Sequence, residues 1–235
     1  MTVAEHILKF YDSFTLENTS LPKDIEVMNP YHNPPKEVEE VIHQFYHKYY
    51  NDTNARGLIL GINPGRLGAG VTGIPFTDSY RLQEFCDIPF PIDTRETSAH
   101  FVYDVIEAYG GTTSFYRDWF IGAVSPLGYI HKNEKGNWVN YNYYDQKDLE
   151  IAVRPFIIDN LKKQLAICGN PNTAVVLGNG KNYKYLKELN KSVKLFDRII
   201  PLEHPRYIMQ YKLKHKDDYV TKFLEKLQDA ISPSA

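Results

Sequence analysis

Residues 57–76 read GLILGINPGRLGAGVTGIPF, a short apolar run followed by a turn rich in glycine and proline. An apolar run of this length predicts a buried parallel strand over residues 57–60. Open α/β sheets bind their ligands at the carboxyl ends of such strands. The turn carries one early amide, Asn63, and one late aromatic ring, Phe76. We therefore predict an active-site loop at the edge of a parallel sheet.

Two phosphate-binding motifs do not account for this loop. No lysine follows its glycines at the spacing of the G-x-x-x-x-G-K-[ST] phosphate loop. Gly68, Gly70 and Gly73 have the spacing of a dinucleotide fingerprint, G-x-G-x-x-G. That fingerprint belongs directly at the end of a strand, however, and here it begins eight residues beyond the run at 57–60. We expect no cofactor.

Three further apolar runs predict strands at residues 119–124, 173–177 and 198–202. Strands that alternate with helical patterns predict a parallel sheet with right-handed crossovers. The expected fold is a single α/β domain over residues 1–235, with three layers and a central four-stranded parallel sheet flanked by helices. Its N-terminal helices, within residues 1–50, should pack on the sheet. The expected helices cover residues 3–14, 36–49, 101–109, 151–167 and 220–231, with Pro155 in the first turn of the fourth.

The composition is that of a globular protein, with 43% hydrophobic and 24% charged residues among 235. Only Cys86 and Cys168 occur, which excludes a disulfide framework and any four-cysteine zinc or iron–sulfur site. His43 and His47 lie four residues apart but lack a third ligand, so we expect no metal. Because no secretory signal or long apolar run is present, we expect a soluble monomer in the cytoplasm or nucleus, with no membrane contact.

Charge is unevenly distributed although the net charge is only −2. Residues 181–226 contain twelve basic and six acidic side chains. A local basic face suits an enzyme that visits DNA transiently, because phosphate contacts supply most non-specific affinity. Ordinary solvated helix surfaces explain the same charges equally well, so this pattern alone does not decide the partner.

The loop resembles motif 1 of the single-strand-selective monofunctional uracil-DNA glycosylases, the SMUG branch of the uracil-DNA glycosylase superfamily. That motif runs G-M-N-P-G, then a glycine, then T-G-V-P-F. In this chain residues 61–65, Gly68 and residues 72–76 fall at the same offsets without a gap. The resemblance implies a monofunctional glycosylase that hydrolyses the bond between uracil and deoxyribose in DNA, as in base-excision repair. It implies DNA as the partner, with the damaged base flipped out, and no lyase step.

The resemblance also suggests roles for individual residues. Asn63 would orient the attacking water, and Phe76 would stack on the base. His204, in the segment EHPR after the last strand, resembles the histidine of motif 2, H-P-S-P-R-N, and would donate a hydrogen bond to the leaving base. Taken alone, Asn63 could be a turn residue, Phe76 a core residue and His204 a structural residue. Further candidates for the base pocket are Ile62, Gly65 and Ser125. The candidates for DNA binding are Lys181, Arg206, Tyr207 and Lys212.

Two departures from the family pattern stand out. The family strand ends H-N-L-C-P-L, and its base-reading asparagine falls on Ala123, which cannot form those hydrogen bonds. Motif 2 keeps His204 and its proline but loses the offset of the intercalating arginine. We therefore expect altered base selectivity, with xanthine or hypoxanthine as further substrates. The alternative is an inactive nucleic-acid- or nucleotide-binding protein on the same scaffold.

Overall fold

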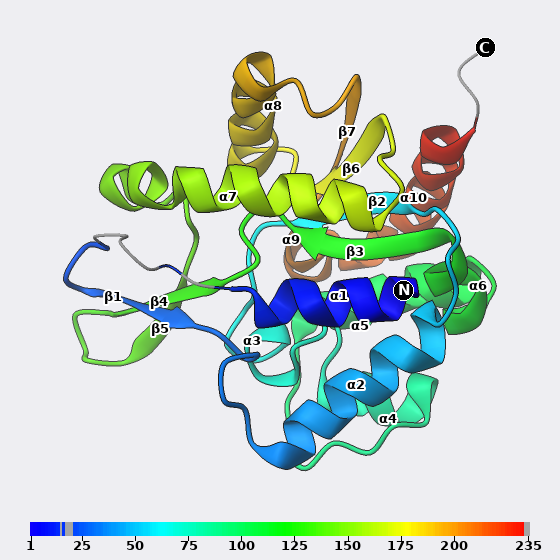
Figure 1. Cartoon of the computed structure of the whole chain (residues 1–235), viewed down its shortest axis with the longest axis horizontal. Helices are drawn as coiled ribbons and strands as arrows, with labels where there is room; N and C mark the ends of the chain where they lie inside the picture. Colours follow the sequence, from blue (N-terminus) through cyan, green and yellow to red (C-terminus); the bar gives the residue numbers. More distant parts are fainter. Residues whose placement is uncertain (15, 17–20, 233–235) are drawn as a thin grey trace.

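Four parallel strands form the central sheet of the computed structural model, which describes residues 1–14, 16 and 21–232 (Figure 1). Their order across the sheet is β3-β2-β6-β7, and helices flank the sheet on both sides. All four strands lie where the apolar runs predict them, and the α/β fold class is confirmed. The strands are β2 (Gly57–Gly61), β3 (Trp119–Ala123), β6 (Thr173–Leu177) and β7 (Arg198–Leu202).

The helices between the strands bury the apolar faces that their sequence periodicity predicts. One hydrophobic cluster joins both N-terminal helices to the sheet and to the C-terminal helix. The bounds are α1 (Val3–Asp12), α2 (Lys36–Tyr50), α3 (Ala69–Thr72), α4 (Ser79–Cys86), α5 (Thr97–Ala108), α6 (Gly111–Asp118), α7 (Lys147–Ile167), α8 (Lys181–Val193), α9 (Pro205–Tyr211) and α10 (Lys216–Ile231), with a 3-10 turn η1 (Leu213–His215).

Helix α7 begins four residues earlier than the expected helix over residues 151–167. It begins at Lys147, so Pro155 lies in the helix interior and not in the first turn. Asp148 and Glu150 lie in the real first turn, where negative charge stabilises the helix dipole. Proline has no N–H to give to the carbonyl four residues earlier, that of Ile151. Ile151 is 59% exposed, and at such a surface position water can bond the freed carbonyl.

A second, antiparallel sheet lies at one end of the molecule, on the left in Figure 1. Asn, Gly, Tyr and Trp residues over 129–144 predict an exposed hairpin or loop insertion, and the structure has a hairpin there. Its strands are joined by a third, from residues 21–35, where the prolines and asparagines predict only a link. The strand order is β1-β4-β5, with β1 (Ile25–Met28), β4 (Gly128–Lys132) and β5 (Trp138–Tyr141).

The central strands are held by burial on both faces. Leu58 and Leu60 on β2 are completely buried, and so is nearly all of Trp119 on β3. A Cβ at Gly57 would lie 2.4 Å from the Trp119 ring, so only glycine fits opposite this indole. Among the residues that the structure describes, none of the helices has both the length and the apolar character needed to cross a bilayer.

Candidate active site

A cavity of about 270 Å³ opens at the carboxyl ends of β2 and β3. Parallel strands end at the same edge of a sheet, so loops far apart in sequence meet there. The loop after β2 and the start of α9 both line the cavity, and the rings of Phe76 and His204 are 6.1 Å apart between their centroids. Seven of the residues singled out from the sequence line this cavity: Ile62, Asn63, Gly65, Phe76, Ala123, His204 and Arg206.

The Asn63 amide is fixed by the backbone of the hairpin. Its Nδ2 donates to the Tyr141 carbonyl at 3.3 Å, and its Oδ1 accepts from the Tyr143 N–H at 3.3 Å. These two contacts decide which end of the amide carries the oxygen. The oxygen retains a second lone pair, with which it can accept a hydrogen bond from a water. Asn63 can therefore orient a water without acting as a strong base.

His204 is the N-cap of α9, and this role fixes its tautomer. Its Nδ1 accepts a hydrogen bond from the backbone N–H of Arg206 at 3.2 Å. A nitrogen that accepts carries no proton, so the proton of the neutral ring is on Nε2. Burial, together with a smaller effect of the positive charge of Arg206, lowers the His204 pKa to about 4. At neutral pH this side chain is therefore an uncharged hydrogen-bond donor in the wall of the cavity.

Phe76 lies in the cavity wall with an unusual backbone conformation. Its φ is 51°, in the left-handed region that bulky residues rarely adopt and that costs of order 1–3 kcal/mol. The Thr72 hydroxyl closes the turn by donating to the Thr77 carbonyl at 2.7 Å. A Cβ on Gly61 would lie 3.1 Å from the Phe76 ring, so the ring rests on bare backbone. The loop thus holds a flat aromatic surface against the cavity.

Ala123 presents only a methyl group to the cavity, and its backbone is fully bonded elsewhere. Gln164 on α7 accepts from the Ala123 N–H at 3.1 Å and donates to its carbonyl at 3.0 Å. This buried amide covers the free edge of β3, which would otherwise leave its hydrogen-bonding groups unpaired. Neither the N–H nor the side chain of Ala123 is therefore available to read a base edge.

Ser125 does not line the cavity, unlike the other base-pocket candidates. It is completely buried, and its hydroxyl shares a 2.8 Å hydrogen bond with the Tyr129 hydroxyl. Its backbone N–H donates to the Ile62 carbonyl at 3.0 Å. Ser125 therefore joins the loop after β3 to the loop after β2, and it does not contact a ligand in this cavity.

The four DNA-binding candidates lie around the cavity at increasing distance. Arg206 lines the cavity itself, whereas Tyr207 and Lys181 line a neighbouring cleft that His204 also borders. Tyr207 is 43% exposed, and Tyr211, one turn further along α9, is 72% exposed. Lys212, the C-cap of α9, lines a further hollow whose other residues come from η1 and α10.

Several cavity residues carry no sequence signal that we recognised. Asn140 and Asn142 come from the hairpin, whose asparagines the sequence marks only as loop formers. Glu96 and Ser98 come from the start of α5, in a stretch with no motif. Their position depends on tertiary packing and not on a local pattern. Within the described ranges, no three His, Cys, Asp or Glu side chains are grouped in a way that could hold a metal ion.

Comparison with known proteins finds a matching family and a similar solved structure. The family model described as the uracil DNA glycosylase superfamily matches residues 47–228. Among solved structures, the chain is similar to the crystal structure of wild-type SMUG2 from Pedobacter heparinus, with a TM-score of 0.93 and 44% sequence identity. That match covers 97% of this chain and 98% of the other. No curated protein sequence matches the chain.

Proposed function

Because the chain belongs to the uracil DNA glycosylase superfamily, we propose that it is a monofunctional DNA glycosylase. It removes uracil from DNA by hydrolysis, and larger deaminated bases such as hypoxanthine or xanthine as well. Its product is an abasic site, the first intermediate of base-excision repair. One observation supports this proposal above all others. A fixed amide, a neutral imidazole donor and a half-buried aromatic ring, from Asn63, His204 and Phe76, border one cavity of about 270 Å³.

The chemistry follows from the charges that develop during bond cleavage. When the bond from the base to C1′ breaks, its electron pair leaves with the base and positive charge builds on the sugar. The Nε2–H of His204 stabilises the negative charge on the base oxygen, as preorganised donors do at other sites of developing charge. A water held by the Asn63 oxygen adds to C1′, and its proton passes through solvent to the departed base anion as the new C–O bond forms, so that the products are neutral free base and an abasic sugar. Phe76 stacks on the base after it has left the helix.

Release of the free base tests this proposal. Purified protein in excess over a single-stranded oligonucleotide with one uracil should liberate free uracil, detected by mass spectrometry, while the same strand carrying thymine stays intact. Retained DNA binding without release of any base would instead indicate a nucleic-acid-binding protein on this scaffold, and would contradict the proposal.

Base selectivity should change when an amide is restored at position 123. In the natural protein the Ala123 methyl leaves both space and missing hydrogen bonds, each worth roughly 1 to a few kcal/mol of discrimination. We expect release of at least one deaminated purine beside uracil, and we expect Ala123→Asn to shift the ratio of rates towards uracil by about tenfold. Oligonucleotides carrying uracil, hypoxanthine or xanthine measure these rates, and Ala123→Ser serves as a matched control. Strict uracil specificity that Ala123→Asn does not alter would contradict this expectation.

Side chains at the start of α9 should contribute more to uracil release from duplex DNA than from single-stranded DNA. Extrusion from a duplex must break a base pair, which costs a few kcal/mol, and a side chain that fills the vacated space offsets this cost. We expect Tyr207→Ala or Arg206→Ala to reduce uracil release from duplex at least about fivefold more than from single-stranded DNA. Tyr211→Ala is the control, because Tyr211 is exposed on the same helix but one turn away from the cavity. Equal losses of uracil release from duplex and from single-stranded DNA would exclude a side chain that fills the vacated space at this position.

A further inference from the structure

A carboxyl group that the proposed reaction does not use lies in the wall of the cavity. Glu96 precedes α5 as its N-cap, and its side chain lines both the cavity and an adjoining cleft. Its Oε2 is shielded from solvent and has no hydrogen-bond partner among the described residues. An enclosed carboxyl oxygen without a partner is costly for folding, so its presence calls for a ligand or a proton.

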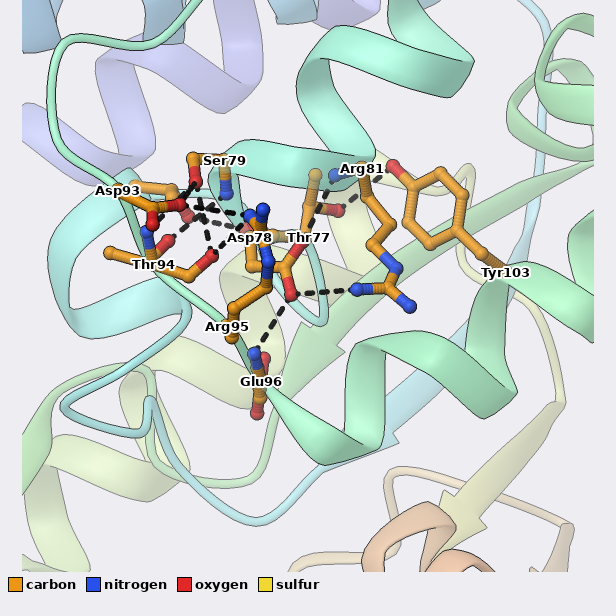
Figure 2. Close-up of polar contacts among 10 residues, drawn as sticks. Thr77, Asp78, Ser79, Arg81, Asp93, Thr94, Arg95, Glu96 and Tyr103 are labelled. Carbon is orange, nitrogen blue, oxygen red and sulfur yellow. Dashed lines mark hydrogen bonds and ion pairs between the residues drawn. The ribbon is translucent and has the colours of Figure 1, made fainter.

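The backbone that carries Glu96 is tied firmly to α4. The Glu96 N–H donates to Asp78 Oδ2 at 2.8 Å (Figure 2). Two residues earlier, Thr94 and Ser79 exchange hydrogen bonds, with N–H to hydroxyl distances of 2.8 and 3.0 Å. Asp78 in turn caps α4 and pairs with Arg81. The backbone that carries the carboxyl is therefore held at the cavity by a network of short contacts.

Bare backbone on the opposite side makes room for this carboxyl. A Cβ at Gly68 would lie only 2.1 Å from Glu96 Oε2, so any side chain there would displace the carboxyl. A Cβ at Gly65 would lie 3.8 Å from Glu96 Oε1 and 3.6 Å from the Asn140 amide nitrogen. The glycines of the site loop thus face Glu96 and Asn140 across the edge of the cavity.

Several charges act on Glu96 from the elements around it. Asp78 and Arg81 face it from α4, and Arg206 faces it from α9. Arg95, Arg66 and Arg206 also line the adjoining cleft. Burial and, to a smaller extent, the negative charge of Asp78 raise the Glu96 pKa, Arg206 and Arg81 oppose them, and the resulting pKa is about 7. Since the pKa lies near neutrality, both the acid and the carboxylate are populated there. His204, across the cavity, stays neutral over this range.

We propose that Glu96 is a specificity-determining residue whose carboxylic acid contacts the flipped-out base, in place of the amide that Ala123 lacks. The inference rests on the proposed function, because it assumes that a base enters this cavity. A protonated carboxyl offers one O–H donor and one C=O acceptor, the same pair that a carboxamide offers. Uracil, hypoxanthine and xanthine all present a ring N–H beside a carbonyl, which complements this pair.

Ionisation of Glu96 should oppose the reaction. The carboxylate can only accept hydrogen bonds, so it loses its contact with the base carbonyl. It also places a negative charge beside a leaving base that is itself becoming negative. Above its pKa, each pH unit leaves about tenfold less of the protonated form. Base release should therefore fall as the pH rises through neutrality.

Glu96→Gln separates these effects, because glutamine keeps both the donor and the acceptor but cannot ionise. Single-turnover uracil release is measured between pH 5.5 and pH 8.5, and each variant is compared with the natural protein at the same pH, which cancels ionisation of the substrate. We expect the natural rate to fall about tenfold across this range and the Glu96→Gln rate to stay level. Glu96→Ala should be at least about tenfold slower than Glu96→Gln at every pH. Glu107→Gln, an exposed acid on the same helix, should match the natural protein.

Binding of an uncleavable substrate separates this inference from the proposed function. Fluorine at C2′ of deoxyuridine withdraws electrons from the sugar and blocks cleavage, so affinity for such an oligonucleotide reports binding without cleavage. Fluorescence anisotropy should show weaker binding at pH 8.5 than at pH 6 for the natural protein and no such difference for Glu96→Gln. If this difference appears but no base is ever released, the proposed function fails and the Glu96 contact stands. If bases are released and Glu96→Gln retains the natural pH profile and affinity, the Glu96 contact is wrong.

Discussion

Replacing Asn63 with alanine should lower the single-turnover rate of uracil release by about two or more orders of magnitude, the size of effect seen when one key catalytic group is lost. Alanine has no oxygen with which to hold the attacking water. The contacts to the Tyr141 carbonyl and the Tyr143 N–H would also be lost. Rates are measured with excess enzyme on single-stranded DNA, so that product release does not limit them.

Two controls make this result specific. Circular dichroism should show an unchanged fold for Asn63→Ala, and affinity for single-stranded DNA should change little, because Asn63 carries no charge. Asn63→Asp keeps an oxygen for the Tyr143 N–H but can no longer donate to the Tyr141 carbonyl, so it tests whether amide orientation matters. A folded Asn63→Ala protein that cleaves at the natural rate would remove this residue from the mechanism.

Replacing His204 should cost about 10²–10³-fold in rate, because it removes the donor to the leaving base. Two variants separate catalysis from folding. His204→Ala loses both the donor and the helix cap, which should also cost about 0.5–2 kcal/mol of stability. His204→Asn keeps an acceptor for the Arg206 N–H, and asparagine is a good cap, but its shorter side chain should not reach the base. We therefore expect both variants to be slow and only His204→Ala to be markedly less stable.

The pH dependence gives an independent check on His204. Its lowered pKa of about 4 means that the ring stays neutral from alkaline pH down to about pH 5. Protonation of this residue should therefore contribute no loss of activity in that range, measured as the ratio of natural to His204→Asn rates. The assignment is wrong if His204→Asn retains the natural rate. It is also wrong if the ratio of the natural rate to the His204→Asn rate changes with an apparent pKa near 6.5.

The sequence predicts the central sheet and the convergence of the main site residues for one physical reason. Strands buried on both faces are continuous apolar runs, and residues 57–60 and 173–177 show this pattern clearly. Polar or aromatic residues just after such strands must meet at the same sheet edge. Asn63 and His204, each two residues after a strand, are therefore found in one cavity although they are distant in sequence. Phe76 reaches the same cavity from the far end of the loop after β2.

Other parts of the site depend on tertiary contacts that no local pattern encodes. The strand β1 forms only because the hairpin offers it an antiparallel partner. Glu96 enters the cavity because Asp78 and Thr94 fix its backbone to α4 and because Gly68 leaves room opposite. Ser125 follows a strand like the others, but the hydroxyl of Tyr129 engages it away from the cavity.

Alkali dependence of strand cleavage tests whether the protein hydrolyses the bond to uracil with a water held at Asn63. The natural protein and Asn63→Ala are each incubated in excess with a single-stranded oligonucleotide that carries one uracil, and each reaction is divided into untreated and alkali-treated halves. We expect the natural protein to yield free uracil and a strand that breaks only after alkali, and Asn63→Ala to yield little of either. A folded natural protein that leaves the strand resistant to alkali, or that breaks it without alkali, would contradict hydrolysis by a water held at Asn63.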